Sequence, residues 1–186
     1  MQTREQWLTA GIEKLKPLFK EAGHDIPPVR VSCGFPGGGS ARKRIGEYWH
    51  ASASEDKVPQ IFISPVLGTA FEHLDTLCHE LVHACTPGHG HKKPFKQLAE
   101  ALGMVGPMRS AGAGPELKLK LEAMALELGD LPHSRLNLAD RKKQTTRLVK
   151  CECPECGYIA RTTAKWIEEK GAPLCPCSGE QMRTSA

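Results

Sequence analysis

The chain has 186 residues, 40% of them hydrophobic, which is enough for one ordinary domain with its own core and a small second unit. It contains no apolar run of about 18 residues, and its N-terminal stretch mixes acidic and apolar residues, unlike a signal or transit peptide. Residues 1–140 hold 16 basic and 16 acidic side chains, so the net charge of +4 comes from residues 141–186. We therefore expect a cytoplasmic protein that does not enter a membrane and that has a basic C-terminal tail.

The first predicted element is a helix over residues 3–22. Its apolar side chains recur at a spacing of three and four residues, which places them on one face, and we expect that face to lie in the core. These residues are Trp7, Leu8, Ile12, Leu15, Leu18 and Phe19. Proline lacks the amide hydrogen that an inner turn needs, so Pro17 should kink or divide the helix.

Three short stretches follow that are rich in strand-forming residues, at 29–33, 44–50 and 60–65. Turn-forming residues separate them, which predicts three strands, and we expect these to form one antiparallel sheet. The glycine-rich stretch 35–44 lacks the Gly-Lys-Ser/Thr ending of a phosphate-binding loop and does not lead into a helix. We interpret it as a hairpin connection.

Three helices are predicted beyond the strands. A wide apolar stripe marks residues 69–85, and it stops at the Thr-Pro-Gly sequence that follows. Proline is well tolerated in a first helical turn, so the next helix should begin at Pro94 and end at Leu102, before a glycine. A short third helix is predicted over 116–129.

Together these elements predict an α+β fold in three parts. A domain at 1–110 holds the strands and the first helices, residues 111–144 form a helical linker without a clear period, and residues 145–186 form a separate tail. Five of the eight cysteines lie in that tail, where clustered thiols in a reducing compartment favour metal binding over disulfides. The scattered cysteines are expected to be small buried hydrophobic residues, namely Cys33, Cys78 and Cys85.

The sequence His-Glu-Leu-Val-His at 79–83 lies within the helix predicted for 69–85. Residues four apart stand one turn above each other, so His79 and His83 can direct imidazole nitrogens at one metal ion. Glu80 lies beside the same face, where its carboxylate can take a proton from a metal-bound water without filling a ligand position. This pattern is typical of a hydrolytic zinc site, which keeps three protein ligands and one open position.

A third protein ligand has to come from beyond that motif, and the residues leave three candidates. His89 has the spacing of the last histidine in H-E-x-x-H-x-x-G-x-x-H, although Thr86 stands where that pattern has glycine. Glu100 on the following helix would give the arrangement of two histidines and a glutamate seen in thermolysin. His91 is the third candidate, and it lies four residues before the aromatic Phe95.

The motif at 79–83, the loop after it, and the spacing of His91 and Phe95 resemble the SprT-like family of zinc metallopeptidases. The resemblance extends to the Gln-Ile-Phe-Ile-Ser-Pro stretch at 60–65 and to the cysteine-rich tail. It departs from many members of the family at Lys92, where they carry glycine. The resemblance implies a minimal zincin-type metallopeptidase domain, in which a small antiparallel sheet is joined by an active-site helix and a support helix.

The resemblance also implies the roles of individual residues. By it, His79, His83 and His91 would bind a catalytic zinc ion, and Glu80 would be the catalytic base. The activity would be that of an endopeptidase, with proteins bound or crosslinked to DNA as substrates.

Four cysteines of the tail have the spacing of a structural zinc site. Cys153 and Cys156 form a Cys-x-x-Cys pair followed by glycine, and Cys175 and Cys177 follow after the length of a β-hairpin. This predicts a zinc ribbon with four cysteine ligands, a unit so small that its metal supplies the folding free energy. One residue rather than two separates the second pair, and Cys151 is a fifth thiol nearby, so the ligand set stays open.

The excess positive charge lies just before the ribbon and within it. Basic side chains can contact phosphates, and aromatic side chains such as Tyr158 and Trp166 can stack on bases. The candidate nucleic-acid contacts are Arg141, Lys142, Lys143, Arg147 and Lys150. We therefore expect single-stranded or damaged DNA as a partner beside a protein substrate. A non-catalytic zinc-ribbon DNA-binding or interaction protein is the alternative, and a carboxylate at position 80 argues against it.

Overall fold

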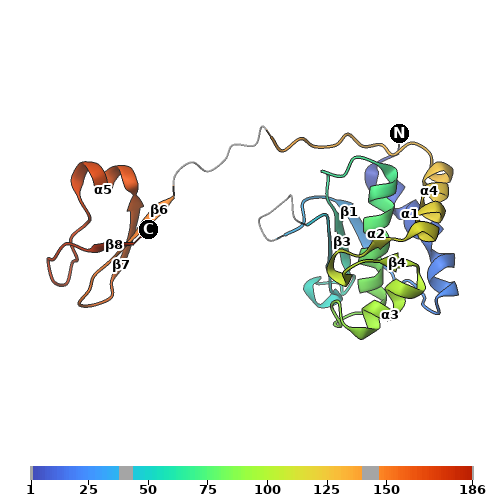
Figure 1. Ribbon diagram of the computed structural model, residues 1–186, viewed down its shortest axis with the longest axis horizontal. Coiled ribbons are helices and arrows are strands. Elements are labelled where there is room, and N and C mark those ends of the chain that lie inside the picture. Colours follow the sequence, from blue (N-terminus) through green and yellow to red (C-terminus); the bar gives the residue numbers. More distant parts are fainter. Residues whose placement is uncertain (1, 38–43, 140–146, 186) are drawn as a thin grey trace. The chain divides into compact units, whose positions relative to one another are not determined.

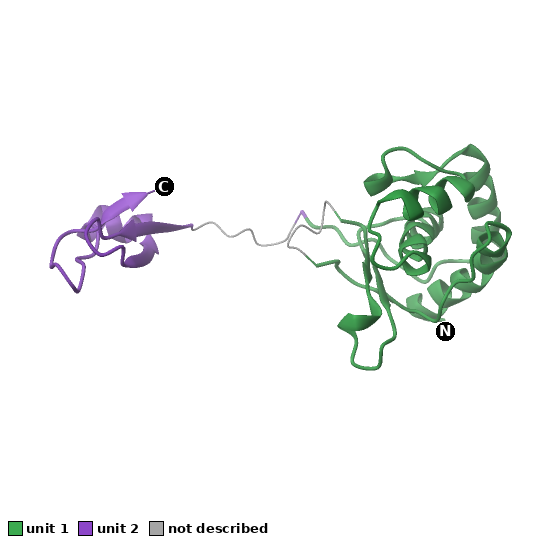
Figure 2. Cartoon of the chain, turned by 90° about the horizontal axis from the view of Figure 1, so that it is seen from below, with its two compact units in different colours: residues 1–138 green, residues 139–186 purple. Residues whose placement is uncertain are grey.

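The computed structural model describes residues 2–37, 44–139 and 147–185 and divides the chain into two compact units (Figures 1 and 2). Unit 1 comprises residues 1–138 and unit 2 comprises residues 139–186. The α+β fold class predicted from the sequence is confirmed, since both units combine helices with small sheets. Among the described residues, no helix is both long and apolar enough to span a membrane.

Helix α1 (Arg4–Glu21) opens unit 1 and begins at a capping box formed by Thr3 and Gln6. All six apolar side chains predicted for its inner face are buried. The helix continues through Pro17, so the predicted division is wrong. Proline inside a helix destabilises it by about 3 kcal/mol or more. Burying each large apolar side chain on this face stabilises the fold by about 1.5–3 kcal/mol, and together these contributions outweigh that cost.

The first sheet has the strand order β1-β3-β2, with β1 at Arg30–Cys33, β2 at Gly46–Trp49 and β3 at Gln60–Ile63. Strand β2 pairs with β3 in the antiparallel direction, but β1 pairs with β3 in the parallel direction. The expected antiparallel sheet is therefore a mixed one. Strand β3 takes the central place because it carries the fully buried Ile61 and Ile63. Strands β2 and β3 form a hairpin around the short helix η1 (Ala51–Ala53). The stretch 35–44, interpreted above as a hairpin connection, joins β1 to β2, which are not neighbours in the sheet. Its residues 38–43 fall outside the described residues.

Helix α2 (Ala70–Cys85) packs against the sheet and α1, and it begins at a capping box of Thr69 and Glu72. Helix α3 (Lys93–Ala101) follows, with Pro94 in its first turn as predicted. Beyond it, the two-residue strands β4 (Met104–Val105) and β5 (Gly112–Ala113) pair with each other across the short helix η2 (Met108–Ser110). The pairing places β5 in contact with α2.

Helix α4 (Pro115–Leu128) corrects the predicted domain boundary. It lies beside α1 and α2 (Figure 1). It buries Leu117 and Leu121 in the same hydrophobic core as the earlier elements. The interpretation of residues 111–144 as a linker is therefore wrong for this helix, because its apolar face has a partner within unit 1.

The described residues of unit 2 form one small sheet and one short helix. Its strands β6 (Leu148–Glu152), β7 (Ile159–Thr163) and β8 (Arg183–Ser185) pair in the antiparallel order β7-β6-β8, and helix α5 (Ala164–Lys170) follows β7. A small core contains three cysteines and Met182. Three of the predicted DNA contacts lie outside the described residues, namely Arg141, Lys142 and Lys143.

Candidate metal centres and active site

Three histidines of unit 1 direct one ring nitrogen each at a common point. His79 and His83 stand on α2, and His91 lies in the loop before α3. Nε2 of His91 is 3.1 Å from Nε2 of His83 and 3.4 Å from Nε2 of His79. Two nitrogens bound to one tetrahedral zinc ion at about 2.05 Å would be about 3.3 Å apart. The spacing therefore suits one metal ion, and this group can hold one.

The two other candidates for a third ligand are not gathered with this pair. His89 is exposed and belongs to none of the potential metal-binding groups that the described residues form. Glu100 is also exposed and forms an ion pair with Lys96 at 3.6 Å on the outer side of α3. Of the three candidates, the structure brings His91 to His79 and His83.

Residues from the segment expected to be a linker orient the first of these histidines. Nδ1 of His79 lies 3.0 Å from the backbone oxygen of Ala111, and since a carbonyl only accepts, Nδ1 carries the hydrogen. Nε2 then keeps its lone pair for a metal, as second-shell carbonyls commonly ensure. One turn earlier on α2, the carboxylate of Asp75 accepts a hydrogen bond of 2.8 Å from the backbone amide of Ala113. Sequence reasoning missed Asp75 and Ala111, because no local pattern reveals contacts over more than 30 residues.

The imidazoles of this group stay neutral near neutral pH. Burial and the two neighbouring rings lower the pKa of His83 to about 3, and burial also lowers the pKa values of His79 and His91. The ring of Phe95 covers all three, with centroid distances of 5.1, 4.5 and 4.8 Å to His79, His83 and His91. Neutral rings with free nitrogen lone pairs are the form in which histidine binds metals.

The carboxyl group of Glu80 lies beside this histidine group and is almost completely buried, with 6% of the residue exposed. Burial, together with the nearby carboxylate of Glu47, raises its pKa to about 8, while Arg44 and the backbone N–H of Tyr48 act in the opposite direction. A Cβ atom on Gly46 would come within 2.4 Å of the Glu80 carboxyl oxygen. Strand β2 can therefore approach helix α2, which carries Glu80, so closely only because glycine stands at position 46.

The histidine group and Glu80 lie in a cleft of about 470 Å³ between α2 and β2. Tyr48 and His50 line it from the strand side, and Arg109 lines it from η2. The ring of Tyr48 stacks on that of His83 at a centroid distance of 6.1 Å, and burial raises the pKa of its hydroxyl. Sequence reasoning did not identify these polar groups, because they reach the cleft from separate elements.

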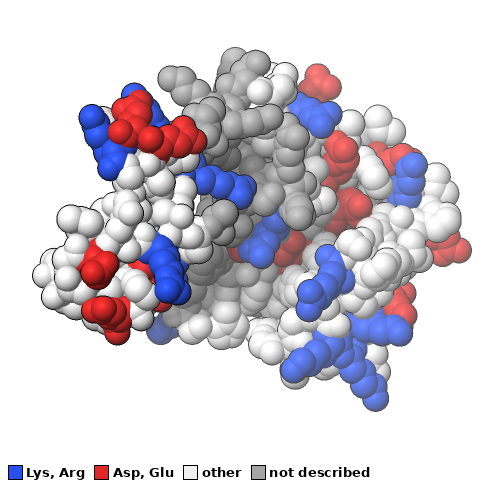
Figure 3. All heavy atoms as spheres, turned by 60° about the vertical axis from the view of Figure 1, so that its left-hand side comes forward, with Lys and Arg blue, Asp and Glu red and all other residues white. Residues whose placement is uncertain are grey.

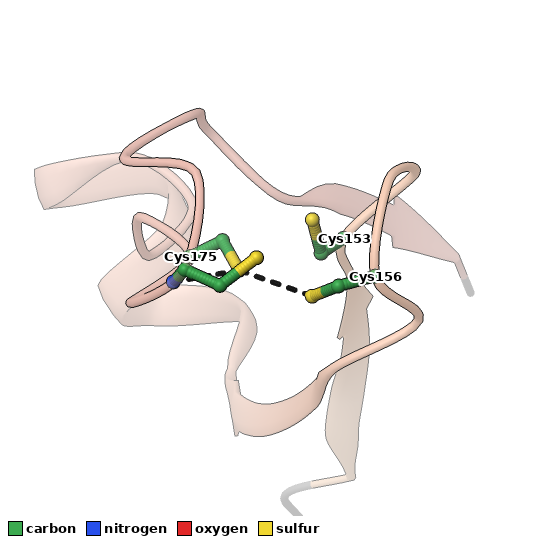
Figure 4. A group of neighbouring side chains, drawn as sticks. Cys153, Cys156 and Cys175 are labelled. Atoms are coloured by element: carbon green, nitrogen blue, oxygen red, sulfur yellow. Dashed lines mark hydrogen bonds between the residues drawn. The ribbon is translucent and has the colours of Figure 1, made fainter.

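Unit 2 gathers the four cysteines predicted for the ribbon. The sulfur atoms of Cys153, Cys156, Cys175 and Cys177 all lie within 4.8 Å of one another and can hold a metal ion. Figure 4 shows Cys153 and Cys156 on one loop and Cys175 on another, with Cys156 and Cys175 joined by a contact of 3.5 Å between their sulfurs. The fifth thiol, Cys151, is not in this group, because it points into the small core from strand β6.

Two similar turns explain the unequal spacing of the cysteine pairs. The backbone oxygen of Cys153 accepts from the amide of Gly157 at 3.0 Å, and that of Cys175 accepts from Gly179 at 2.8 Å. In the second turn Ser178 stands where the first has Cys156, and Cys177 supplies the fourth sulfur from one position earlier.

The backbone amides of this second turn favour the thiolate form of its first cysteine. Hydrogen bonds from Cys177 and Ser178 lower the pKa of Cys175 to about 6. A metal ligand has to be a thiolate, so Cys175 is the thiol of this turn that is suited to binding a metal, whereas hydrogen bonds with Cys156 and Cys175 raise the pKa of Cys177 to about 12.

Comparison of the chain with protein-family models, curated proteins and solved structures gave no match. The similarity to SprT-like metallopeptidases therefore rests on the motif residues and their spacing. What the protein does has to follow from the chemistry of the side chains that the fold gathers.

Proposed function

We propose that the chain is a zinc-dependent metalloendopeptidase of SprT-like type, with one catalytic and one structural zinc ion. The observation that carries this proposal is the convergence of His79, His83 and His91 in a cleft, beside the buried carboxyl group of Glu80. Three protein ligands with open space next to them favour a catalytic over a structural zinc site.

Glu80 is the group that would move the proton. Zinc bound to the histidines would supply Lewis acidity, lowering the pKa of a water molecule and polarising a peptide carbonyl. A nearby cation favours the ionised form of a carboxyl group, so Glu80 would change from an acid of pKa about 8 to a carboxylate when the metal site is filled. It could then accept a proton from water and return it to the leaving amine.

Two further side chains are placed to stabilise the negative charge that develops on the carbonyl oxygen. The hydroxyl of Tyr48 can donate a hydrogen bond, since its raised pKa keeps it protonated, and Arg109 supplies a fixed positive charge. Both line the same cleft as the histidines. A site that only stabilised the fold would need neither these groups nor a buried carboxyl group, which argues against the non-catalytic alternative.

Unit 2 supports the proposal that the substrates are bound or crosslinked to DNA. Lys150 on β6 and Arg161 on β7 are direct cross-strand partners, so their side chains lie on one face of the sheet, although Lys150 also pairs with Glu152. Trp166 is half exposed, and Nζ of Lys165 lies 5.5 Å from the centre of its ring. Figure 3 shows basic side chains in small groups among acidic and uncharged ones.

The proposal is tested by cleavage of a single-stranded-DNA-binding protein by the full chain, with and without DNA. We expect cleavage that a zinc chelator stops, that added zinc restores, and that single-stranded DNA accelerates. An exposed-position variant, His89→Ala, should cleave like the wild type. Failure of the zinc-loaded chain to cleave the substrate under any of these conditions would contradict the proposed activity, and cleavage unaffected by DNA would contradict the proposed substrate class.

A further inference from the structure

A second group of potential metal ligands lies in unit 1, away from the cleft. It consists of Cys33 at the end of β1, His73 in the first half of α2, and His133 in the segment after α4. One ligand atom from each lies within 4.8 Å of the other two. The sequence did not suggest this group. Cys33, expected to be a small buried hydrophobic residue, packs against the core but is only partly buried, and its thiol accepts from Arg4.

The hydrogen bonds of His73 leave one nitrogen free. Its Nδ1 lies 2.8 Å from the backbone oxygen of Thr69, so Nδ1 carries the hydrogen and Nε2 has a lone pair. The residue is only 1% exposed, and its Nε2 has no hydrogen-bond partner among the described residues. Burial of an unpaired polar atom costs about 1–3 kcal/mol, which indicates that a partner outside the protein satisfies it.

His133 is held in a similar way, with its two nitrogens exchanged. Its Nε2 lies 3.0 Å from the backbone oxygen of Leu67 and therefore carries the hydrogen, which leaves the lone pair on Nδ1. The rings of His73 and His133 meet edge to face, with their centroids 4.8 Å apart. Backbone carbonyls thus orient both rings so that one unprotonated nitrogen of each belongs to the group, as is common for metal-binding histidines.

A cation already occupies part of this place. Nη1 of Arg4 lies 3.3 Å from Nδ1 of His133 and 3.7 Å from the sulfur of Cys33. The guanidinium therefore donates to two of the three potential ligand atoms, while Nε2 of His73 remains without a partner among the described residues. The three ligand atoms therefore favour a positive charge between them, and Arg4 contacts only two of the three. Arg4 is only partly buried at the start of α1, so its side chain can move outward.

We propose that Cys33, His73 and His133 bind a third metal ion, of the zinc type, which displaces the side chain of Arg4. One thiolate and two imidazoles are a donor set that suits zinc. In a tetrahedral zinc site the donor atoms would be about 3.3–3.6 Å apart, so ligand atoms now within 4.8 Å would close by about 1 Å. The ion would fasten the segment after α4 to β1 and α2.

The test uses the full chain, saturated with zinc and freed of excess, and compares Cys33→Ser with Cys85→Ser by elemental analysis. Cys85 is a matched control, because it is another partly exposed thiol of unit 1 that belongs to no potential metal-binding group of the described residues. We expect Cys33→Ser to hold one zinc ion fewer per chain than Cys85→Ser. The cleft histidines and the ribbon cysteines are present in both variants, so the difference does not depend on the proposed function.

A second measurement reports on the thiol itself. Alkylation of the wild-type chain with iodoacetamide, mapped by mass spectrometry, should be slowed at Cys33 by zinc about tenfold or more, because a metal-bound thiolate is a poor nucleophile. Zinc should not change the rate at Cys85, and His133→Gln should abolish the protection of Cys33. Equal zinc content in the two serine variants, or alkylation of Cys33 that zinc does not slow, would overturn the proposal.

Discussion

The buried carboxyl group of Glu80 should make the stability of the metal-free protein depend on pH. Its pKa is about 8 in the folded protein and 4.5 in an unfolded chain, so between these values the folded state retains a proton that the unfolded state releases. The free energy of unfolding must then decrease as pH rises, by up to about 1.4 kcal/mol per pH unit. Over the whole interval the loss could reach about 5 kcal/mol, an upper value for a group that can relax toward water.

The substitution Glu80→Gln removes the titrating group and keeps its shape. Both proteins are unfolded with urea in the presence of a chelator and followed by far-ultraviolet circular dichroism. The free energy of unfolding of the variant should increase relative to that of the wild type by roughly 1 kcal/mol per pH unit between about pH 5.5 and 7.5. The cleft histidines, whose pKa values are lowered, destabilise the fold as pH falls below their ordinary value of 6.5, and they are common to both proteins. A difference between the proteins that stays constant with pH would refute the raised pKa.

Three further predictions concern other parts of the chain. Substitution of His91 by Ala should remove one zinc ion per chain in elemental analysis, whereas His89→Ala should not, and the reverse result would contradict the ligand assignment. Leu121→Ala should lower the free energy of unfolding by about 2–5 kcal/mol. Leu119→Ala, at a position 68% exposed, should change it by less than about 0.5 kcal/mol. Equal losses for the two variants in urea titrations would contradict the packing of α4 in the core. If the tail neutralises about three phosphates, log affinity for single-stranded DNA should fall with log salt at a slope of about −2, and Trp166→Ala should weaken binding; no binding at low salt would contradict the contact.

Features encoded by short sequence patterns were predicted well. The buried face of α1 follows from the spacing of its apolar residues, and α3 begins around Pro94 as expected. The pairing of His79 with His83 needs only the helical repeat, and Cys153 and Cys156 need only one turn. In each case the relevant residues are separated by a few positions, so local geometry decides the outcome.

Features that depend on distant residues were not predicted. The direction of β1 is set by its pairing with β3 about 30 positions later, and nothing in either strand alone encodes it. Helix α4 has a weak pattern of its own and was therefore separated from the core that it completes. The group of Cys33, His73 and His133 spans 100 residues of sequence, and only the folded chain brings these side chains together.

The most direct test of the proposed peptidase centre is the cleavage rate of Glu80→Gln relative to the wild type, measured on one protein substrate at matched zinc content. The amide keeps the size of the side chain and leaves the three histidines in place, so we predict unchanged zinc content. General acid–base catalysis contributes about 10²–10⁴-fold, and cleavage should fall by at least that factor. Cleavage by the zinc-loaded variant at the wild-type rate would contradict the role of Glu80 and with it the proposed mechanism.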